Sequence, residues 1–146
     1  MRRSHNPNEV HPGVGLIKML RRDNHLKELA PFYKTEDDLE ELIEDVSGGQ
    51  SLCAAFCLYQ SAHIDLSRVD TRNVINTSYL LWDSPNLETV DLSGWDLSKV
   101  VLSKSMFEGC NKLKAITMRG CNESTVNLIK TQLAADGLGG VEIITD

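Results

Sequence analysis

The chain has 146 residues, 41% of them hydrophobic, and this fits one domain of ordinary size with a single core. The formal net charge of −6 excludes a generic nucleic-acid-binding protein, because contact with phosphates needs a basic surface, and it favours a neutral or basic protein partner. Neither the segment behind the first arginines nor any run of about 18 residues is apolar, so we expect a cytoplasmic protein with no membrane partner.

The N-terminal part is expected to be helical after a short tail. Residues 1–12 are polar, contain two prolines and lack periodicity, which predicts a mobile tail. Residues 13–29 have apolar residues at helical spacing, interrupted near Asp23 and Asn24. This pattern predicts one bent helix or two short ones, ended by Pro31.

The charge reverses in the next segment. Thr35 and Asp38 have the spacing of a capping box, and apolar residues follow at i, i+3, i+4 and i+7, which predicts a helix with one face in the core. The other face carries acids only: Glu36, Asp37, Asp38, Glu40, Glu41, Glu44 and Asp45. Two interpretations are open, a solvated helix face and an acidic surface that docks on a basic protein groove.

The apolar pattern of residues 51–60 indicates that this segment is the closing half of a degenerate first repeat. Phe56 precedes Leu66 by ten residues, and Leu81 precedes Leu92 by eleven, so Phe56 matches a position that recurs in the repeats. On this interpretation residues 13–60 form a helical cap that shields one end of a repeat stack and makes one domain with it.

The remaining residues, 61–146, repeat themselves. The sequence Asp-Leu-Ser-Gly-Trp-Asp-Leu-Ser-Lys-Val from Asp91 recurs 26 residues earlier, from Asp65, and more weakly 26 residues later, from Thr117. Each copy has the L-x-x-L-x-L spacing of a leucine-rich repeat. We therefore predict an α/β solenoid: a short leucine-rich-repeat stack of three to four coils, with parallel strands and an N-terminal helical cap.

Apolar residues of successive copies fall into columns that a stack of coils would bury. The strand positions are Leu87, Val90 and Leu92, then Leu113, Ile116 and Met118, then Leu138, Val141 and Ile143, with a last step of 25 residues. Another column holds Val69, Trp95 and Cys121. Between the last two strands we expect a helix capped by Ser124 and ended by Gly137.

One repeat carries a longer motif. It runs Asp-Leu-Ser-x-Trp-Asp-x-Ser-x-Val, and then Met106-Phe107-x-Gly109-Cys110-x-x-Leu113. This motif resembles the bacterial leucine-rich repeats of the BspA type, closely over residues 61–120 and loosely over 121–146. The resemblance implies the same fold and no enzymatic activity, in a family of mostly long, secreted surface arrays.

Candidates for chemistry are few. Cys53 and Cys57 are four residues apart on an expected helix, with His63 six residues further on, so a zinc site or a zinc enzyme is one interpretation and buried thiols are the other. Asp65 and Asp91 would lie about 5 Å apart on neighbouring strands, but repetition explains that spacing without any reaction. We expect no enzymatic activity and no cofactor.

Binding surfaces remain. The candidate partner-binding residues are Glu36, Asp37, Glu40, Glu41 and Glu44 of the acidic helix, and His63, Asp65, Thr89, Asp91, Thr117 and Arg119 of the outward strand face. A merely solvated sheet is the alternative for the second group. The predicted function is a non-catalytic intracellular protein-binding module that offers an acidic surface to a basic partner.

Small size and acidity are also typical of a stoichiometric inhibitor of a nucleic-acid-handling protein. A phage or mobile-element antagonist of a host defence nuclease, similar to an anti-CRISPR protein, fits this profile. The alternatives are a fragment of a bacterial surface or phage tail adhesin, and the zinc protein built on Cys53, Cys57 and His63.

Overall fold

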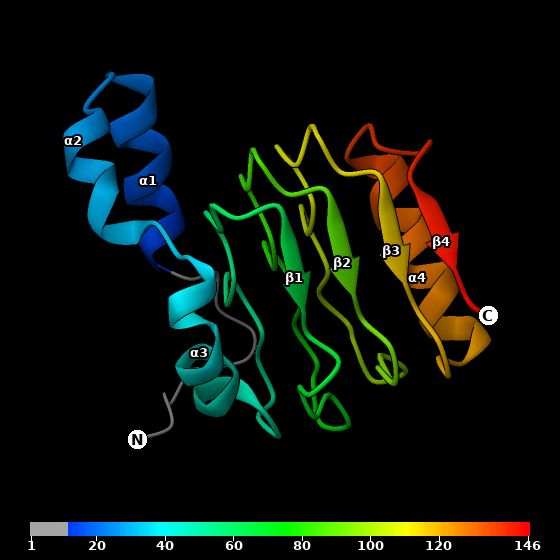
Figure 1. Cartoon of the computed structure of the whole chain (residues 1–146). Coiled ribbons are helices and arrows are strands. Elements are labelled where there is room, and N and C mark those ends of the chain that lie inside the picture. The colour runs from blue at the N-terminus through cyan, green and yellow to red at the C-terminus, as the bar shows by residue number, and fades with distance from the viewer. Residues whose placement is uncertain (1–11) are drawn as a thin grey trace.

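The computed structural model describes residues 12–146 (Figure 1). Its helices are α1 (Pro12–Arg22), α2 (Leu26–Leu29), α3 (Leu39–Val46) and α4 (Glu123–Ala135), with the 3-10 turns η1 (Ala30–Phe32) and η2 (Glu36–Asp38) before α3. The strands are β1 (His63–Asp65), β2 (Thr89–Asp91), β3 (Ala115–Thr117) and β4 (Glu142–Ile144). Except for Pro12, the predicted mobile tail lies outside the described residues. No helix of the described part is long and apolar enough to cross a membrane.

The predicted solenoid is confirmed. The four strands form one parallel sheet in the order β1-β2-β3-β4, and Ile64 pairs with Val90 and Val90 with Ile116, so residues 26 apart are neighbours. In each of the first three strands only the central residue is buried. The strand is short because one apolar residue per coil is enough to anchor it in the stack.

On the side opposite the sheet, the closing segments before β1, β2 and β3 are joined by a second ladder of backbone hydrogen bonds. The amide of Leu52 donates to the carbonyl of Asn76, and the amide of Thr77 to the carbonyl of Leu102, both at 2.8 Å. Ala54, Tyr79 and Ser105 occupy the left-handed region at equivalent places, with φ of 55°, 60° and 56°. The backbone conformation and the hydrogen bonds therefore repeat on the closing side as they do in the sheet.

The main core runs through the stack. Trp95 is buried in the predicted column between Val69 and Cys121, and its indole Nε1 donates to the carbonyl of Leu66 at 2.7 Å. Cys121 repeats the contact one coil later, since its Sγ donates to the carbonyl of Leu92 at 3.3 Å. The column thus joins coils by packing and by hydrogen bonds.

Helix α3 covers one end of this core. The predicted capping box is confirmed, because the amide of Thr35 donates to Asp38 Oδ2 at 2.8 Å and the amide of Asp37 donates to Thr35 Oγ1 at 3.3 Å. Ile43 is buried in the main core, and three partly buried residues of the predicted stripe pack beside it: Leu39, Leu42 and Val46.

The segment predicted as one bent helix or two short ones forms two helices, α1 and α2. Asn24 has a φ of 59° at the break between them. Their buried residues join a second, smaller core against the closing side of the coils, where Tyr79 and Trp82 lie. Figure 1 shows this pair of helices standing apart from the sheet.

Two expectations about the last coil are wrong. Ile116 pairs with Ile143, so the last step between strands is 27 residues and not 25. The third coil closes through helix α4, and the turn behind that helix shifts the register of the strand that follows. The N-cap is Asn122, whose Oδ1 accepts from the amide of Thr125 at 2.8 Å, while Ser124 lies inside the helix.

Candidate functional site

The acidic residues of the predicted site gather on one exposed face. Glu36, Asp37, Glu40, Glu41 and Glu44 are all exposed, since the buried side of α3 holds the opposite, apolar stripe. Arg68, from the loop after β1, approaches this face, with its Nη1 4.0 Å from Glu40 Oε1. Both side chains are largely exposed, so this pair neutralises little of the acidic face.

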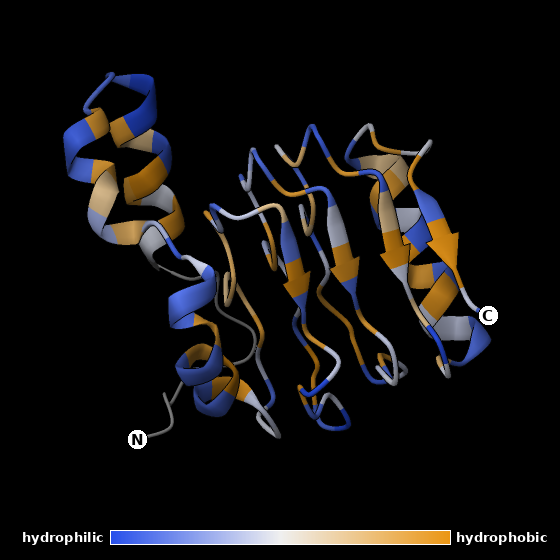
Figure 2. Cartoon of the chain, in the orientation of Figure 1, coloured by the Kyte–Doolittle hydropathy of each residue, from blue (hydrophilic) through white to orange (hydrophobic). Residues whose placement is uncertain are grey.

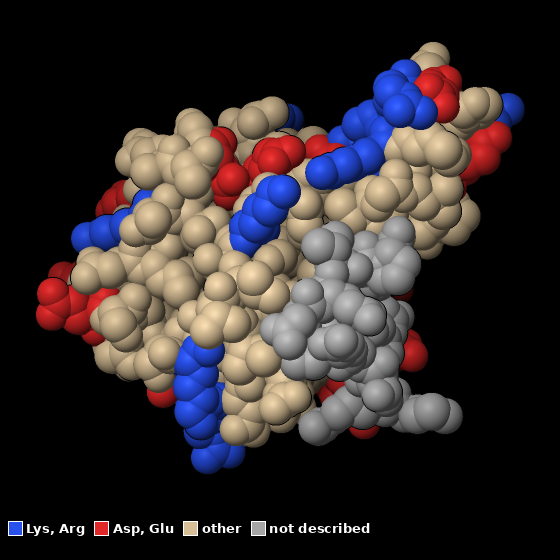
Figure 3. Space-filling view, turned by 180° about the vertical axis from the view of Figure 1, so that it is seen from behind, with Lys and Arg blue, Asp and Glu red and all other residues tan. Residues whose placement is uncertain are grey.

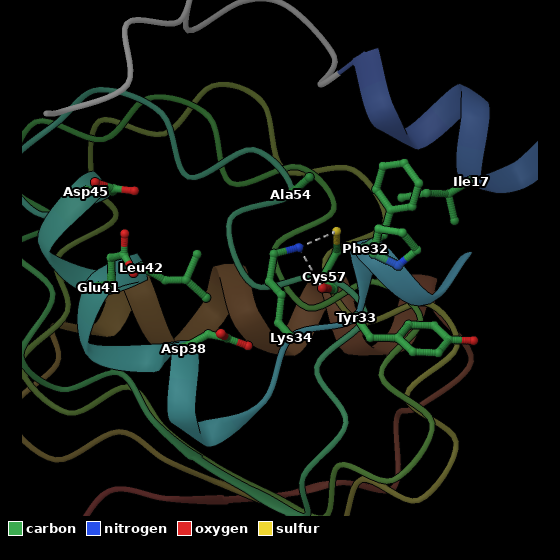
Figure 4. A pocket seen from close by; sticks show the side chains of 11 residues that line it. Ile17, Phe32, Tyr33, Lys34, Asp38, Glu41, Leu42, Asp45, Ala54 and Cys57 are labelled. Atoms are coloured by element: carbon green, nitrogen blue, oxygen red, sulfur yellow. Dashed lines mark hydrogen bonds between the residues drawn. The ribbon is translucent and has the colours of Figure 1, made fainter. Parts of the chain in front are cut away.

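A pocket of about 430 Å³ lies beside this face, between α3, η1 and the first coil (Figure 4). Asp38, Glu41 and Asp45 line one side of it, because their spacing places them on successive turns of the same helical face. Phe32 and Tyr33 lie across from these acids. The pocket therefore combines an anionic wall with an aromatic one.

Lys34 lies between the two walls. Its Nζ donates to the carbonyl oxygen of Cys57 at 2.9 Å and lies 3.4 Å from Cys57 Sγ. Its backbone is held as well, since the amide of Lys34 donates to the carbonyl of Leu58 at 3.0 Å and its carbonyl accepts from Gln60 at 2.7 Å. The described residues of the lining include three acids and one base, so this part of the wall carries an excess of negative charge.

Basic side chains gather elsewhere. The exposed bases of the helical arm are Lys18, Arg21, Arg22 and Lys27. Lys18 Nζ lies 5.2 Å from the ring centre of Tyr79, and Arg21 pairs with Asp83, so the arm is fastened to the second coil. Figure 3 shows blue side chains gathered on the α1–α2 arm, while much of the stack surface visible from that side is uncharged.

The strand-face candidates come together on the sheet but are largely engaged with one another. His63 and Thr89 are in register, and His63 Nδ1 lies 2.6 Å from Thr89 Oγ1. Asp65 Oδ1 accepts from the hydroxyl of Ser67 at 2.6 Å and from its amide at 2.9 Å, and these bonds lower the pKa of Asp65. The strand face is thus a polar, internally bonded surface.

The rest of that face repeats the same pattern. Asp91 Oδ1 accepts from the amide of Ser93 at 2.9 Å, as Asp65 does one coil earlier. Thr117 pairs with Asp91 in the next strand, and the Nε of Arg119 donates to the carbonyl of Asp146 at 2.8 Å. The two aspartates therefore accept hydrogen bonds from turn amides, a structural use.

The cysteines do not form the expected arrangement. Cys53 and Cys57 lie in turns and not on a helix, because Ala54 and Leu58 have φ of 55° and 58°. Neither thiol forms a disulfide bond, and between residues 12 and 146 no group of three or more His, Cys, Asp or Glu residues is placed to hold a metal ion. His63 is on the sheet face, beside Thr89.

The other two cysteines serve packing. Burial raises the pKa of the Cys110 thiol to about 12, and its Sγ donates to the carbonyl of Leu81 at 3.1 Å. Burial also raises the pKa of Cys121. A raised pKa keeps both thiols protonated and unreactive.

The pocket is the part of the site that sequence reasoning missed. Its lining comes from four separate segments, and only the spacing of Asp38, Glu41 and Asp45 along one helical face could have indicated it. The exposed acids and the strand-face residues, in contrast, lie in the places that their periodicity predicts.

Comparison with known proteins identifies the family. A family model described as "Mycoplasma protein of unknown function, DUF285" matches residues 27–132. No curated protein and no solved structure gives a significant match. The matched span includes the acidic helix, the residues of the pocket other than Ile17, and three of the four strands. The chain therefore belongs to the DUF285 family, a leucine-rich-repeat-like family.

Proposed function

We propose that this chain is a non-catalytic protein-binding module whose acidic helix α3, with the pocket beside it, accepts a basic surface of a partner protein. The observation that carries the proposal is the pocket, in which the carboxylates of Asp38, Glu41 and Asp45 lie across from Phe32 and Tyr33. A lysine or arginine side chain matches both walls, since its aliphatic stem packs on aromatic rings and its charged head pairs with carboxylates.

The surroundings of the pocket support the same partner. Further exposed acids, Glu36, Asp37, Glu40 and Glu44, extend the negative surface beyond the rim. The first two lie on η2 and the other two on α3; the capping box holds η2 and Ile43 holds α3 in the core, so little conformational freedom is lost on binding. A stable interface of about 800 Å² per partner would also include part of the strand face.

The partner class follows from charge. A protein that handles nucleic acids presents a basic, phosphate-binding surface, and an acidic protein of net charge −6 that occupies this surface inhibits it. We propose this inhibitory role, as for an antagonist of a defence nuclease. This role predicts competition, in which duplex DNA and this chain exclude each other from the partner.

We also propose the closer relationship to BspA-type repeats. Support comes from Met106, Phe107 and Cys110, which are fully buried at the positions where the motif of the second repeat predicts core residues. The polar part of the motif has a matching structural use, because Asp96 Oδ1 accepts from the amide of Ser98 at 3.0 Å.

The test replaces Glu40, Glu41 and Glu44 with lysine. We expect the triple variant to lose at least tenfold in affinity for a partner isolated by affinity capture from the source cells, and to lose most of the salt dependence of binding. Its melting temperature should change little, because all three side chains are exposed.

The matched control carries the same change in charge at dispersed exposed sites, Glu28, Glu108 and Glu123, each replaced by lysine. It should bind like the wild type. Equal affinity of the two triple variants for the partner would contradict docking through α3. Unchanged binding in the presence of excess duplex DNA would contradict the inhibitory role alone.

A further inference from the structure

The acids that line the pocket beside α3 differ in how far the fold already uses them. Asp38 Oδ2 accepts from the amide of Thr35 at 2.8 Å and lies 3.3 Å from the Thr35 hydroxyl, so this oxygen serves the capping box. Glu41 lies one turn further along and makes no hydrogen bond or ion pair with any residue between 12 and 146. Both oxygens of its carboxylate are therefore available to a ligand.

The base of the described lining does not neutralise Glu41. Lys34 Nζ donates to the carbonyl oxygen of Cys57 at 2.9 Å, and Figure 4 shows it turned toward Cys57 and away from Glu41. Within residues 12–146 Lys34 forms no ion pair with Asp38 or Glu41. Glu41 therefore keeps a negative charge that a cation of the partner can balance.

The aromatic wall offers a ring that the core uses little. Tyr33 is 38% exposed, whereas Phe32 packs partly against the smaller core. Figure 2 shows the hydrophilic and hydrophobic residues of this region side by side, and Figure 4 shows both rings across the pocket from the acids of α3. A side chain that enters between the walls thus meets a ring on one side and carboxylates on the other.

From these contacts we propose that the pocket is an arginine-selective subsite, which binds the guanidinium of one arginine of the partner and prefers it to the ammonium of a lysine. The inference rests on the binding function proposed above and specifies the ligand of the same pocket. The volume of about 430 Å³ is in the range of ligand pockets and is sufficient for one such side chain.

A guanidinium matches the two walls better than an ammonium does. It is planar, so it stacks on the ring of Tyr33 while its edge faces the acids. Two parallel N–H groups donate to the two oxygens of Glu41, and further donors of the same group reach toward Asp38 on the preceding turn. A lysine ammonium is a compact, strongly hydrated charge that has no flat face and loses more water on entry.

The probes are three blocked peptides, acetyl-Gly-X-Gly-amide, in which X is arginine, lysine or citrulline. Added to the ¹⁵N-labelled chain at up to about 10 mM, the arginine peptide should shift the amide signals of Tyr33, Lys34 and Glu41. The lysine peptide should bind more weakly, by a factor of about five or more. The citrulline peptide keeps the planar shape but not the charge, and it should not bind.

A matched pair of variants tests the carboxylate. Glu41→Gln removes the charge that the guanidinium pairs with, and we expect it to lower the affinity for the arginine peptide about tenfold. Glu123→Gln makes the same chemical change at an exposed position of α4 that does not line the pocket, and it should bind the peptide like the wild type. The amide spectra report whether both variants are folded.

A second pair tests the ring. Tyr33→Leu keeps an apolar side chain but removes the flat face, and it should reduce the preference for arginine over lysine to about twofold or less. Tyr33→Phe keeps the ring and should keep the preference.

Equal affinity of the wild type for the arginine and lysine peptides would overturn the arginine preference and leave docking of a basic partner intact. The absence of any shift with the arginine peptide, or an unchanged affinity in Glu41→Gln, would overturn the pocket as its binding site. The proposed function fails on a different measurement, the affinity of the α3 lysine variant for the whole partner, so the two failures are distinguishable.

Discussion

The end of the stack at β1 and the end at β4 consist of the same kind of coil but are finished differently. At the β1 end, α3 buries Ile43 against the core, and the hydroxyl of Tyr59 donates to the carbonyl of His63 at 2.9 Å, which satisfies a group on the outer edge. At the β4 end, Ile143 is only partly buried and lines a groove between α4 and β4. The comparison shows that helix α3 buries the core at the β1 end, whereas β4 has β3 as its one neighbouring strand among the described residues.

The two ends of the stack also differ in charge. Helix α3 turns an apolar stripe inward and a row of acids outward, so the covered end is itself a charged surface. The open end has one charged residue on its groove, Lys130, among the residues described there. We therefore propose electrostatic docking at the end that α3 covers.

The largest expected loss of stability comes from a substitution in the middle of the stack, at Trp95. Trp95→Ala should destabilise the fold by about 3–5 kcal/mol, because it opens a cavity in the central column and removes the hydrogen bond to the carbonyl of Leu66. Urea unfolding measures this loss. Trp95→Phe, which keeps a ring but not the indole donor, should cost clearly less, and a wild-type midpoint for the alanine variant would refute the role of the column.

A matched pair of isoleucines tests the comparison directly. Ile43→Ala at the covered end should cost about 2–5 kcal/mol, as expected for a buried side chain. Ile143→Ala at the open end should cost about 1 kcal/mol, because part of that side chain already contacts water. Equal losses in urea unfolding would mean that the two ends are equally covered.

The smallest effect concerns pH at the open end. Burial raises the pKa of Asp136, which follows α4 and accepts from the amide of Phe107 at 3.0 Å through Oδ2. A raised pKa favours folding below the unfolded value of 3.8, and this contribution is lost as pH rises through the folded pKa.

Asp136→Asn removes that titration and can keep the hydrogen bond through its amide oxygen. The variant should therefore gain stability over the wild type at pH 7, and this gain should be smaller at pH 3. Urea midpoints of both proteins at both pH values measure it. A stability difference between the two proteins that is the same at pH 3 and pH 7 would show that Asp136 does not titrate with folding.

Local patterns accounted for much of the fold because each repeat is a local unit. The 26-residue period placed Ile64 beside Val90, and the capping box at Thr35 placed the start of the acidic helix segment. The prediction failed where helical spacing occurs in a segment that is not a helix. Cys53 and Cys57 have helical spacing but lie in turns, because the first coil follows the left-handed backbone positions of its neighbours.

The register of the last strand failed for a related reason. Leu138, Val141 and Ile143 continue the apolar spacing of the repeat, but helix α4 takes the place of a turn-rich closing segment, and the pairing moves to 27 residues. Periodicity alone does not record how many residues a different closing element consumes.

By itself the sequence determined the repeat, the column of Val69, Trp95 and Cys121, and the separation of apolar and acidic faces on α3, because these depend on spacing within a strand or helix. Only the tertiary structure decided that Lys34 and Cys57 meet in a pocket, that Arg68 approaches Glu40, and that Ile143 pairs with Ile116. Such contacts join segments far apart in the chain, and their positions depend on how the coils and helices pack, which no local pattern encodes.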